Sequence, residues 1–473
     1  MSFYFCGKNT IFLSMGHVSL TNIYSEFKNS IQVALPLIAS EVIYALSGFV
    51  ATAMIAHFGK AELAANALVW EIYIVVIVFF IGIFCSVSIM VSQSFGAHDI
   101  HSISVCFKQG VIMTIMFTPL MIFIMWLAPE VLILTKQDPL VIELARPFFH
   151  SLMWTMLPLS IMFVIEQFLI GIARTKIVLL MSILIVPLQI FFFYVFLFGK
   201  FGVLQLGLAG IGYGLTISYS LVVLFFICYL QFSRLLKPYQ LFNKWWILKR
   251  KVLLELIRVG LPLGFMFGIE VALFVAVAIM MGLFGITTLA AYQIAYQYIM
   301  LALAFIFALT QTVTVRIGNE VGKNNRNALQ LVNMALGFGF MLIFSIFYIG
   351  FPRFVIGLDI DIHAPDLQQL VYEATVFLSM AGILILIDCL RLINAGALRG
   401  LKDTTVPLII SILGFWGIAF PAAYLLAFRF GVGEIGIWWG IMLGLFIAAI
   451  TLFIRFKRLV RDSNLVALVT RIE

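Results

Sequence analysis

The amino-acid sequence predicts an all-α membrane protein whose twelve transmembrane helices form two pseudo-symmetric six-helix bundles. Three observations lead to this prediction: 63% of the 473 residues are hydrophobic, only 11% are charged, and the two halves of the chain repeat each other. The mean hydropathy of +1.14 excludes a soluble globular chain. A membrane β-barrel is excluded as well, because its strands are shorter and alternate polar with apolar residues.

Twelve mainly apolar segments are long enough to cross a bilayer core of about 30 Å as helices. They cover residues 31–56, 63–95, 104–128, 140–172, 177–199, 206–231, 253–283, 287–315, 328–351, 368–398, 405–428 and 433–454. The predicted domains are a cytosolic segment 1–30, a first lobe 31–231, a basic cytosolic linker 232–252, a second lobe 253–455 and a cytosolic tail 456–473. Because each lobe has an even number of spans, both enter the membrane from the same side, and a pseudo-two-fold axis along the membrane normal relates them.

The two lobes share a sequence repeat. Residues 35–65 align without a gap with residues 261–291, at an offset of 226 that also places Gly96 on Gly322. The shared LPL at the start and FG…LAA at the end of these segments are more specific than apolar composition alone. Duplicated halves in a membrane protein are typical of a transporter whose site lies between the repeats.

The charge of the loops predicts the orientation. The linker 232–252 is basic and contains no acidic residue, whereas the loop between the ninth and tenth spans contains Asp359, Asp361 and Asp366. Cytoplasmic loops are enriched in Lys and Arg, so both termini are predicted to lie in the cytoplasm. The same enrichment of basic residues in cytoplasmic loops explains the net charge of +8, so no nucleic-acid partner is predicted from it. Trp245 and Trp246 lie among the linker lysines and predict either a short amphipathic helix on the inner leaflet or a solvated connector.

Nucleotide-driven transport and enzyme chemistry have no signature in the sequence. The string GNEVGKNN at 318–325 lacks the glycine spacing and the hydroxyl residue of a phosphate-binding loop. The six histidines are dispersed, and the five cysteines have no metal-binding or disulfide spacing. The prediction is therefore a protein that is not an enzyme, has no cofactor and draws on an ion gradient, worth about 2.3 kcal/mol per charge per 100 mV.

Two acidic residues lie near the middle of predicted spans of the second lobe. Glu270 follows Arg258 by about 18 Å of helix, and Asp388 precedes Arg399 by about 16 Å. Together they can hold a sodium ion or exchange protons, which predicts a cation-coupling site; the alternative is a structural ion pair. Arg391 follows Asp388 on the same helix face and is close enough to contact it.

Three further acidic residues occur inside predicted spans. Glu41 lies near the mid-plane, Glu166 close to the cytosolic end of its span, and Glu71 near the outer end. For each of them, a hydrogen-bonded core residue or a snorkelling side chain is the favoured interpretation.

Aromatic and amide side chains predict a surface for flat lipophilic cations. The eighth span places Tyr292 and Tyr296 at i,i+4, beside Gln293 and Gln297 at the same spacing. Aromatic faces attract cations, and a carboxylate supplies the opposite charge. Ordinary helix packing is the alternative for any single aromatic residue. The predicted substrate-cavity residues are Tyr44, Trp70, Tyr73, Gln189, Tyr292, Gln293, Tyr296, Gln297 and Arg391.

Several strings occur in order through both halves. They are LPLIAS…GFVATAMIAHFG, VSQSFGAHD, GIARTK and PLQI…FGKFGV, followed by GLPLGFMFGIE, LAAYQIAYQ, RIGNEVGK and IDCLRLINAGALRGLKDT. At these spacings residues 31–455 resemble the MATE (multidrug and toxic compound extrusion) family of secondary transporters, in its NorM-like bacterial branch. The resemblance implies two six-helix bundles in a V around a central cavity, and export of organic cations by sodium or proton antiport. It also matches the family's glutamine-rich stripe at Gln293 and Gln297.

The resemblance implies that Glu270 and Asp388 bind the coupling cation, and two positions depart from the family pattern. Ala51 stands where an aspartate usually follows GFV, so a first-lobe proton switch cannot use that residue. Arg391 would compete with a cation bound at Asp388. Either Glu270 then carries most of the coupling, or the protein has specialised away from general drug efflux.

The resulting prediction is a cation-coupled antiporter of the bacterial inner membrane, using Na+ or H+, that exports lipophilic, mostly cationic compounds. Its partners would be small organic substrates and membrane lipids, with no nucleic acid and no obligate protein partner. One alternative is a dedicated exporter of a secondary metabolite. Another is a lipid-linked precursor flippase of the same superfamily, although such flippases commonly have additional spans or a basic central cavity.

Overall fold

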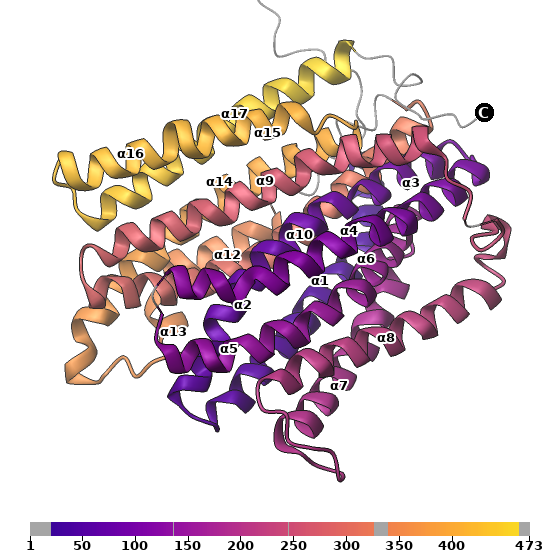
Figure 1. Cartoon of the computed structure of the whole chain (residues 1–473). Coiled ribbons are helices and arrows are strands. Elements are labelled where there is room, and N and C mark those ends of the chain that lie inside the picture. Colours follow the sequence, from indigo (N-terminus) through magenta and orange to yellow (C-terminus); the bar gives the residue numbers. More distant parts are fainter. Residues whose placement is uncertain (1–19, 136, 245, 326–338, 463–473) are drawn as a thin grey trace, which may run out of the picture.

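The computed structural model describes residues 20–135, 137–244, 246–325 and 339–462. Within these ranges every regular element is a helix (Figure 1), which confirms the predicted all-α class. Eleven helical segments are long and apolar enough to cross a membrane, and each coincides with a predicted span. The remaining predicted span, 328–351, begins outside the described residues. Its described part is α12 (Gly339–Gly350), an apolar helix shorter than the ~20 residues that a crossing needs.

The helices of the first half follow the predicted spans closely. They are α1 (Leu20–Ala56), α2 (Lys60–Phe84), α3 (Ser86–Gly96), α4 (Ile100–Leu134), α5 (Pro139–Leu152), η1 (Met153–Thr155), α6 (Met156–Gly171), α7 (Thr175–Phe198) and α8 (Ala209–Phe232). The second predicted span is divided at Cys85 into α2 and α3. Asp99 and Asp138 cap α4 and α5, because their side chains accept hydrogen bonds from the free backbone N–H groups of the first turn.

The second half repeats this pattern after the linker. Its elements are η2 (Lys237–Tyr239), α9 (Arg250–Gly282), α10 (Ile286–Gly322), α12, α13 (Pro352–Ile356), η3 (Pro365–Leu367), α14 (Gln368–Gly400), α15 (Thr405–Ile412), η4 (Leu413–Ala419), α16 (Phe420–Tyr424), η5 (Leu425–Arg429) and α17 (Glu434–Asp462). Two of them, η4 and η5, are π-helical, so the eleventh predicted span alternates between α and the wider π winding.

The sequence repeat is also visible in how the two halves pack. The halves meet where α3 packs on α10 and where α2 packs on α9. A Cβ atom at Gly96 would clash with the backbone oxygen of Asn319, and a Cβ atom at Gly322 would clash with that of Gln93. Gly96 and Gly322, like Gln93 and Asn319, are 226 residues apart. This reciprocity is what a pseudo-two-fold relation between the halves requires.

Candidate functional site

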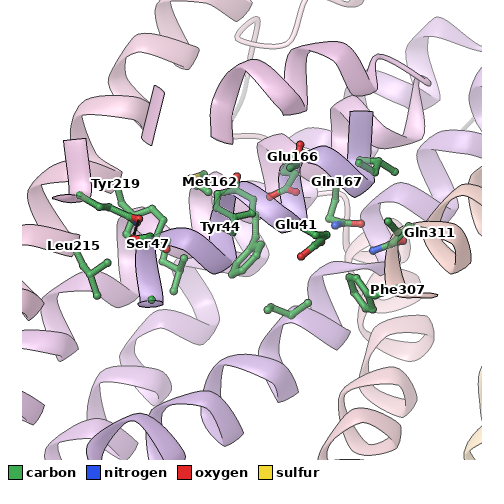
Figure 2. Close-up of a pocket in the computed structure, with 18 of the residues that line it drawn as sticks. Glu41, Tyr44, Ser47, Met162, Glu166, Gln167, Leu215, Tyr219, Phe307 and Gln311 are labelled. Carbon is green, nitrogen blue, oxygen red and sulfur yellow. Dashed lines mark hydrogen bonds between the residues drawn. The ribbon is translucent and has the colours of Figure 1, made fainter. Parts of the chain in front are cut away.

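A cavity of about 320 Å³ lies inside the first half and reaches the second. Helices α1, α2, α6, α7 and α8 contribute most of its walls, and three residues of α10 complete it: Phe307, Ala308 and Gln311 (Figure 2). Because α10 belongs to the second half, this cavity of the first half extends to a contact between the two repeats.

Two carboxyl groups line this cavity, Glu41 from α1 and Glu166 from α6 (Figure 2). Glu166 is only 7% exposed, and its Oε2 has no hydrogen-bond partner among the described residues. None of the described residues that line the cavity is a lysine, arginine or histidine. An unpaired carboxylate in a membrane interior is costly unless a proton, water or a cation compensates it. The spacing of these two residues favours packing or snorkelling roles, whereas the structure brings both to one cavity.

Aromatic and amide groups surround the two acids. Tyr44, Trp70 and Gln189, three of the predicted substrate residues, line the cavity. The Tyr44 hydroxyl has no hydrogen-bond partner among the described residues, while Ser47 of α1 donates to Gln189 Oε1 of α7 at 2.6 Å. The predicted residue Tyr73 does not line the cavity, but its ring packs edge-on against Trp70 with centroids 5.0 Å apart.

Ala51, which stands at the position of the usual family aspartate, also lines the cavity. It is buried and lies on the same helix as Glu41, about 15 Å further along the axis. The cavity therefore has an acidic group at Glu41 and an apolar methyl group where the resemblance would place a second one.

The predicted stripe on α10 lies apart from this cavity and has two faces. Tyr292 and Tyr296 stack with ring centroids 5.7 Å apart, and Tyr292 packs on Trp438 of α17. Gln293 and Gln297 are exposed on another face of the helix. Neighbouring helix positions are about 100° apart, so the tyrosines and the glutamines cannot share one face.

Arg391 of α14 joins the two predicted coupling acids. Its Nε donates to Asp388 Oδ1 and its Nη2 donates to Glu270 Oε1, both at 2.6 Å. Phe415 lies over the guanidinium, 4.9 Å from its carbon to the ring centroid. The i,i+3 contact with Asp388 is the one that the spacing predicts. The sequence does not predict the contact with Glu270, because that contact depends on the placement of α9 relative to α14.

The three charged side chains differ in their exposed fraction. The side chains of Arg391 and Asp388 are 0% and 2% exposed, whereas that of Glu270 is 14% exposed. Asp388 Oδ2 and Arg391 Nη1 have no hydrogen-bond partner among the described residues. Two carboxylates and one guanidinium leave a formal net charge of −1 in this triad, with Glu270 as its most accessible member.

The chain matches a known protein family in two segments, one in each half. The MatE family profile matches residues 36–195 and 262–425. The probable multidrug resistance protein NorM of Rhizobium meliloti (strain 1021) is 31% identical over 440 residues, which cover 92% of this chain and 94% of that protein. The protein of the same name from Pseudomonas aeruginosa is 30% identical, with 91% and 89% covered.

Solved structures with the same fold are more distant in sequence. The Vibrio cholerae MATE transporter VcmN in the bent form superposes with a TM-score of 0.81 at 16% identity, covering 93% of this chain and 98% of that one. The eukaryotic MATE transporter AtDTX14 gives 0.78 at 19% identity, covering 94% and 98%. The chain therefore belongs to the MATE family of membrane transporters.

Proposed function

We propose that this transporter is a cation-coupled antiporter that exports lipophilic, mostly cationic organic molecules across the bacterial inner membrane, with both termini in the cytoplasm. The observation that carries the proposal is the cavity inside the first half, where Glu41 and Glu166 meet no basic residue among the described lining residues. The bacterial relatives are named as probable multidrug resistance proteins, and these names support small organic substrates.

The walls of the cavity suit such substrates. Its volume of about 320 Å³ is in the range of small-molecule sites. Tyr44, Trp70 and Tyr219 supply aromatic surface, and a cation over such a ring gains about 0.5–2 kcal/mol. Glu41 and Glu166 supply the opposite charge. In an empty cavity, a bound proton or water must compensate the charge of these two acids. A bound organic cation can take over this role.

We propose that the predicted coupling site at Glu270 and Asp388 works through Glu270, which exchanges its partner, while Asp388 stays paired with Arg391. Asp388 is held by a guanidinium on its own helix, so the contact requires no relative movement of helices. Glu270 is held from another helix and is more accessible. A sodium ion or proton that reaches Glu270 would take the place of Arg391 Nη2. At about 150 mV, one such charge supplies roughly 3.5 kcal/mol, enough for a substrate ratio of a few hundred.

A dedicated exporter of one metabolite is the second candidate, and the triad favours it. A guanidinium between the coupling acids and Ala51 at the usual aspartate position are both departures from the family pattern. A lipid-linked precursor flippase has less support, because its phosphate-bearing substrate would meet two acids in this cavity.

The deciding experiment is transport by the purified protein in proteoliposomes with an imposed Na+ or H+ gradient. The probes are tetraphenylphosphonium and ethidium as cations, and dyes of similar size that are anionic or uncharged. We expect gradient-driven movement of the cations alone. Movement of anionic probes, or equal movement of all probes without a gradient, would contradict the proposal.

A further inference from the structure

A second cavity, of about 440 Å³, lies away from the transport cavity, between the start of α4 and the linker that joins the halves. Three lysines line it: Lys108 of α4, and Lys244 and Lys249 of the linker. His101 of α4, which can also carry a positive charge, lines it as well. The described lining residues include no aspartate or glutamate. In the part of the chain that the structure describes, none of the three lysines forms an ion pair. The cavity is therefore suited to an anion.

Hydrogen bonds hold the linker against α4 and so shape this basic pocket. Gln109 Nε2 donates to the backbone oxygen of Ile247 at 2.9 Å, and Gln109 Oε1 accepts from the backbone N–H of Lys249 at 3.1 Å. Ser104 Oγ donates to the backbone oxygen of Gln240 at 3.4 Å. Gln109 itself is 1% exposed, and both of its hydrogen bonds to the linker are partly buried. These bonds position the lysine-bearing segment on the helix.

The basic pocket lies where three membrane-spanning helices end or begin. Helix α8 ends at Phe232, and α4 and α9 begin at Ile100 and Arg250. Between two lining lysines, the linker exposes three apolar side chains: Trp246, Ile247 and Leu248, at 68%, 44% and 48%. Apolar and aromatic side chains flanked by lysines are typical of a segment in the interface, with rings at the headgroup boundary and ammonium groups among the phosphates.

We propose that the basic pocket binds the phosphate group of an anionic phospholipid in the leaflet next to the linker. Lysine ammonium groups bind phosphate as point charges and form charge-assisted hydrogen bonds. A zwitterionic headgroup also carries a cation, which finds no acidic partner among the described lining residues. Anionic lipid is therefore favoured over zwitterionic lipid. The bound lipid links the first half to the linker, and this role is independent of the transported substrate.

The test uses the full-length protein in nanodiscs or micelles that contain phosphatidylglycerol or phosphatidylcholine. Bound lipid is measured by native mass spectrometry, and stability by thermal unfolding. The pocket variant K108Q/K244Q/K249Q removes three charges that line the cavity. The matched variant K237Q/R250Q/K251Q removes three charges from the same region but none from the lining. We expect the pocket variant alone to lose phosphatidylglycerol affinity by about tenfold or more, equivalent to ~1.4 kcal/mol, together with the stabilisation by this lipid.

Equal losses in the two variants would overturn the proposal in favour of diffuse surface attraction. Stabilisation by inorganic phosphate or glycerol phosphate, without stabilisation by phosphatidylglycerol, would also overturn it in favour of a free anion. If the triple pocket variant does not fold, Lys108→Met decides, because methionine keeps the apolar stem of this half-buried residue. Weaker phosphatidylglycerol binding by Lys108→Met supports the proposal, and unchanged binding overturns it.

Discussion

Arg391 Nη2 and Glu270 Oε1 lie 2.6 Å apart on two different helices of the second half, α14 and α9. The same guanidinium also contacts Asp388, so a fixed positive charge stands between the acids to which the family resemblance assigns the coupling cation. A free cation that binds at this site must therefore compete with the Arg391 guanidinium for the two carboxylates. Substitutions at Glu270, Asp388 and Arg391 can separate the roles of these three residues.

Glu270→Gln should abolish cation-driven transport while leaving the amount of protein in the membrane close to wild type. Glutamine keeps the size of the side chain and can still accept a hydrogen bond from Arg391, but it cannot carry the charge that a coupling ion needs. Gradient-driven efflux of ethidium in proteoliposomes measures the effect. Efflux at the wild-type rate would remove Glu270 from the mechanism.

The double variant Asp388→Asn with Arg391→Gln should transport nearly as well as wild type, whereas Arg391→Gln alone should be strongly impaired. The double variant keeps the net charge of −1, because only Glu270 remains ionised in the triad. The single variant leaves the buried Asp388 and the partly buried Glu270 without their guanidinium, and breaking a buried pair costs about 3–5 kcal/mol. The measurements are membrane level and efflux rate. Normal membrane levels with no transport in the double variant would return Asp388 to the coupling site.

Glu41→Gln and Glu166→Gln should each weaken binding of tetraphenylphosphonium, and the double variant should weaken it by about tenfold or more, or ~1.4 kcal/mol. Each change removes one carboxyl group that can pair with a bound cation, from a cavity in which no described lining residue is basic. Equilibrium binding to the purified protein measures the affinity. Glu143→Gln is the matched control, since Glu143 is exposed on α5 and does not line the cavity. Equal affinity in all variants would show that the acids do not contact the substrate.

Ala51→Asp should reach the membrane at a level close to wild type. Residue 51 lines a cavity, where a carboxylate can be hydrated or meet a cation. A control is Leu224→Asp on the exposed face of α8, where a carboxylate facing lipid costs at least about 2.5 kcal/mol. Membrane levels are measured by immunoblot of separated membranes. Loss of Ala51→Asp to the same extent as the control would show that packing, not a wet cavity, surrounds residue 51.

Hydropathy and length were sufficient to predict the helical spans, because a bilayer allows few alternatives to a helix of about 20 apolar residues. They could not predict interruptions. The segment after Cys85, where the second span divides, is less apolar than α2 but still lies within the predicted span, and the segment Leu413–Ala419, where π winding begins, is apolar as well. Both interruptions depend on how backbone hydrogen bonds are redistributed between neighbouring turns.

The candidate sites show the same limit. The contact of Arg391 with Asp388 was predictable, because helix geometry alone brings i and i+3 together. The shared cavity of Glu41 and Glu166 was not, since it depends on the rotation of α1 and α6 about their own axes. That rotation is determined by packing throughout the bundle. The signal in the sequence is the presence of acidic residues inside several different spans. Comparing all such acids as possible pairs could have identified the shared cavity of Glu41 and Glu166.

The crossed contacts of Gly96 with Asn319 and of Gly322 with Gln93 have a further consequence. In an isologous dimer, residue i of one subunit meets residue j of the other, and j meets i in return. The two halves of this chain obey that rule at an offset of 226 residues. Gln311 even donates to its own counterpart, Cys85 Sγ, at 3.4 Å, so these two lie close to the pseudo-symmetry axis. Each half therefore carries a self-complementary surface, and the fused chain is geometrically a dimer of its own halves.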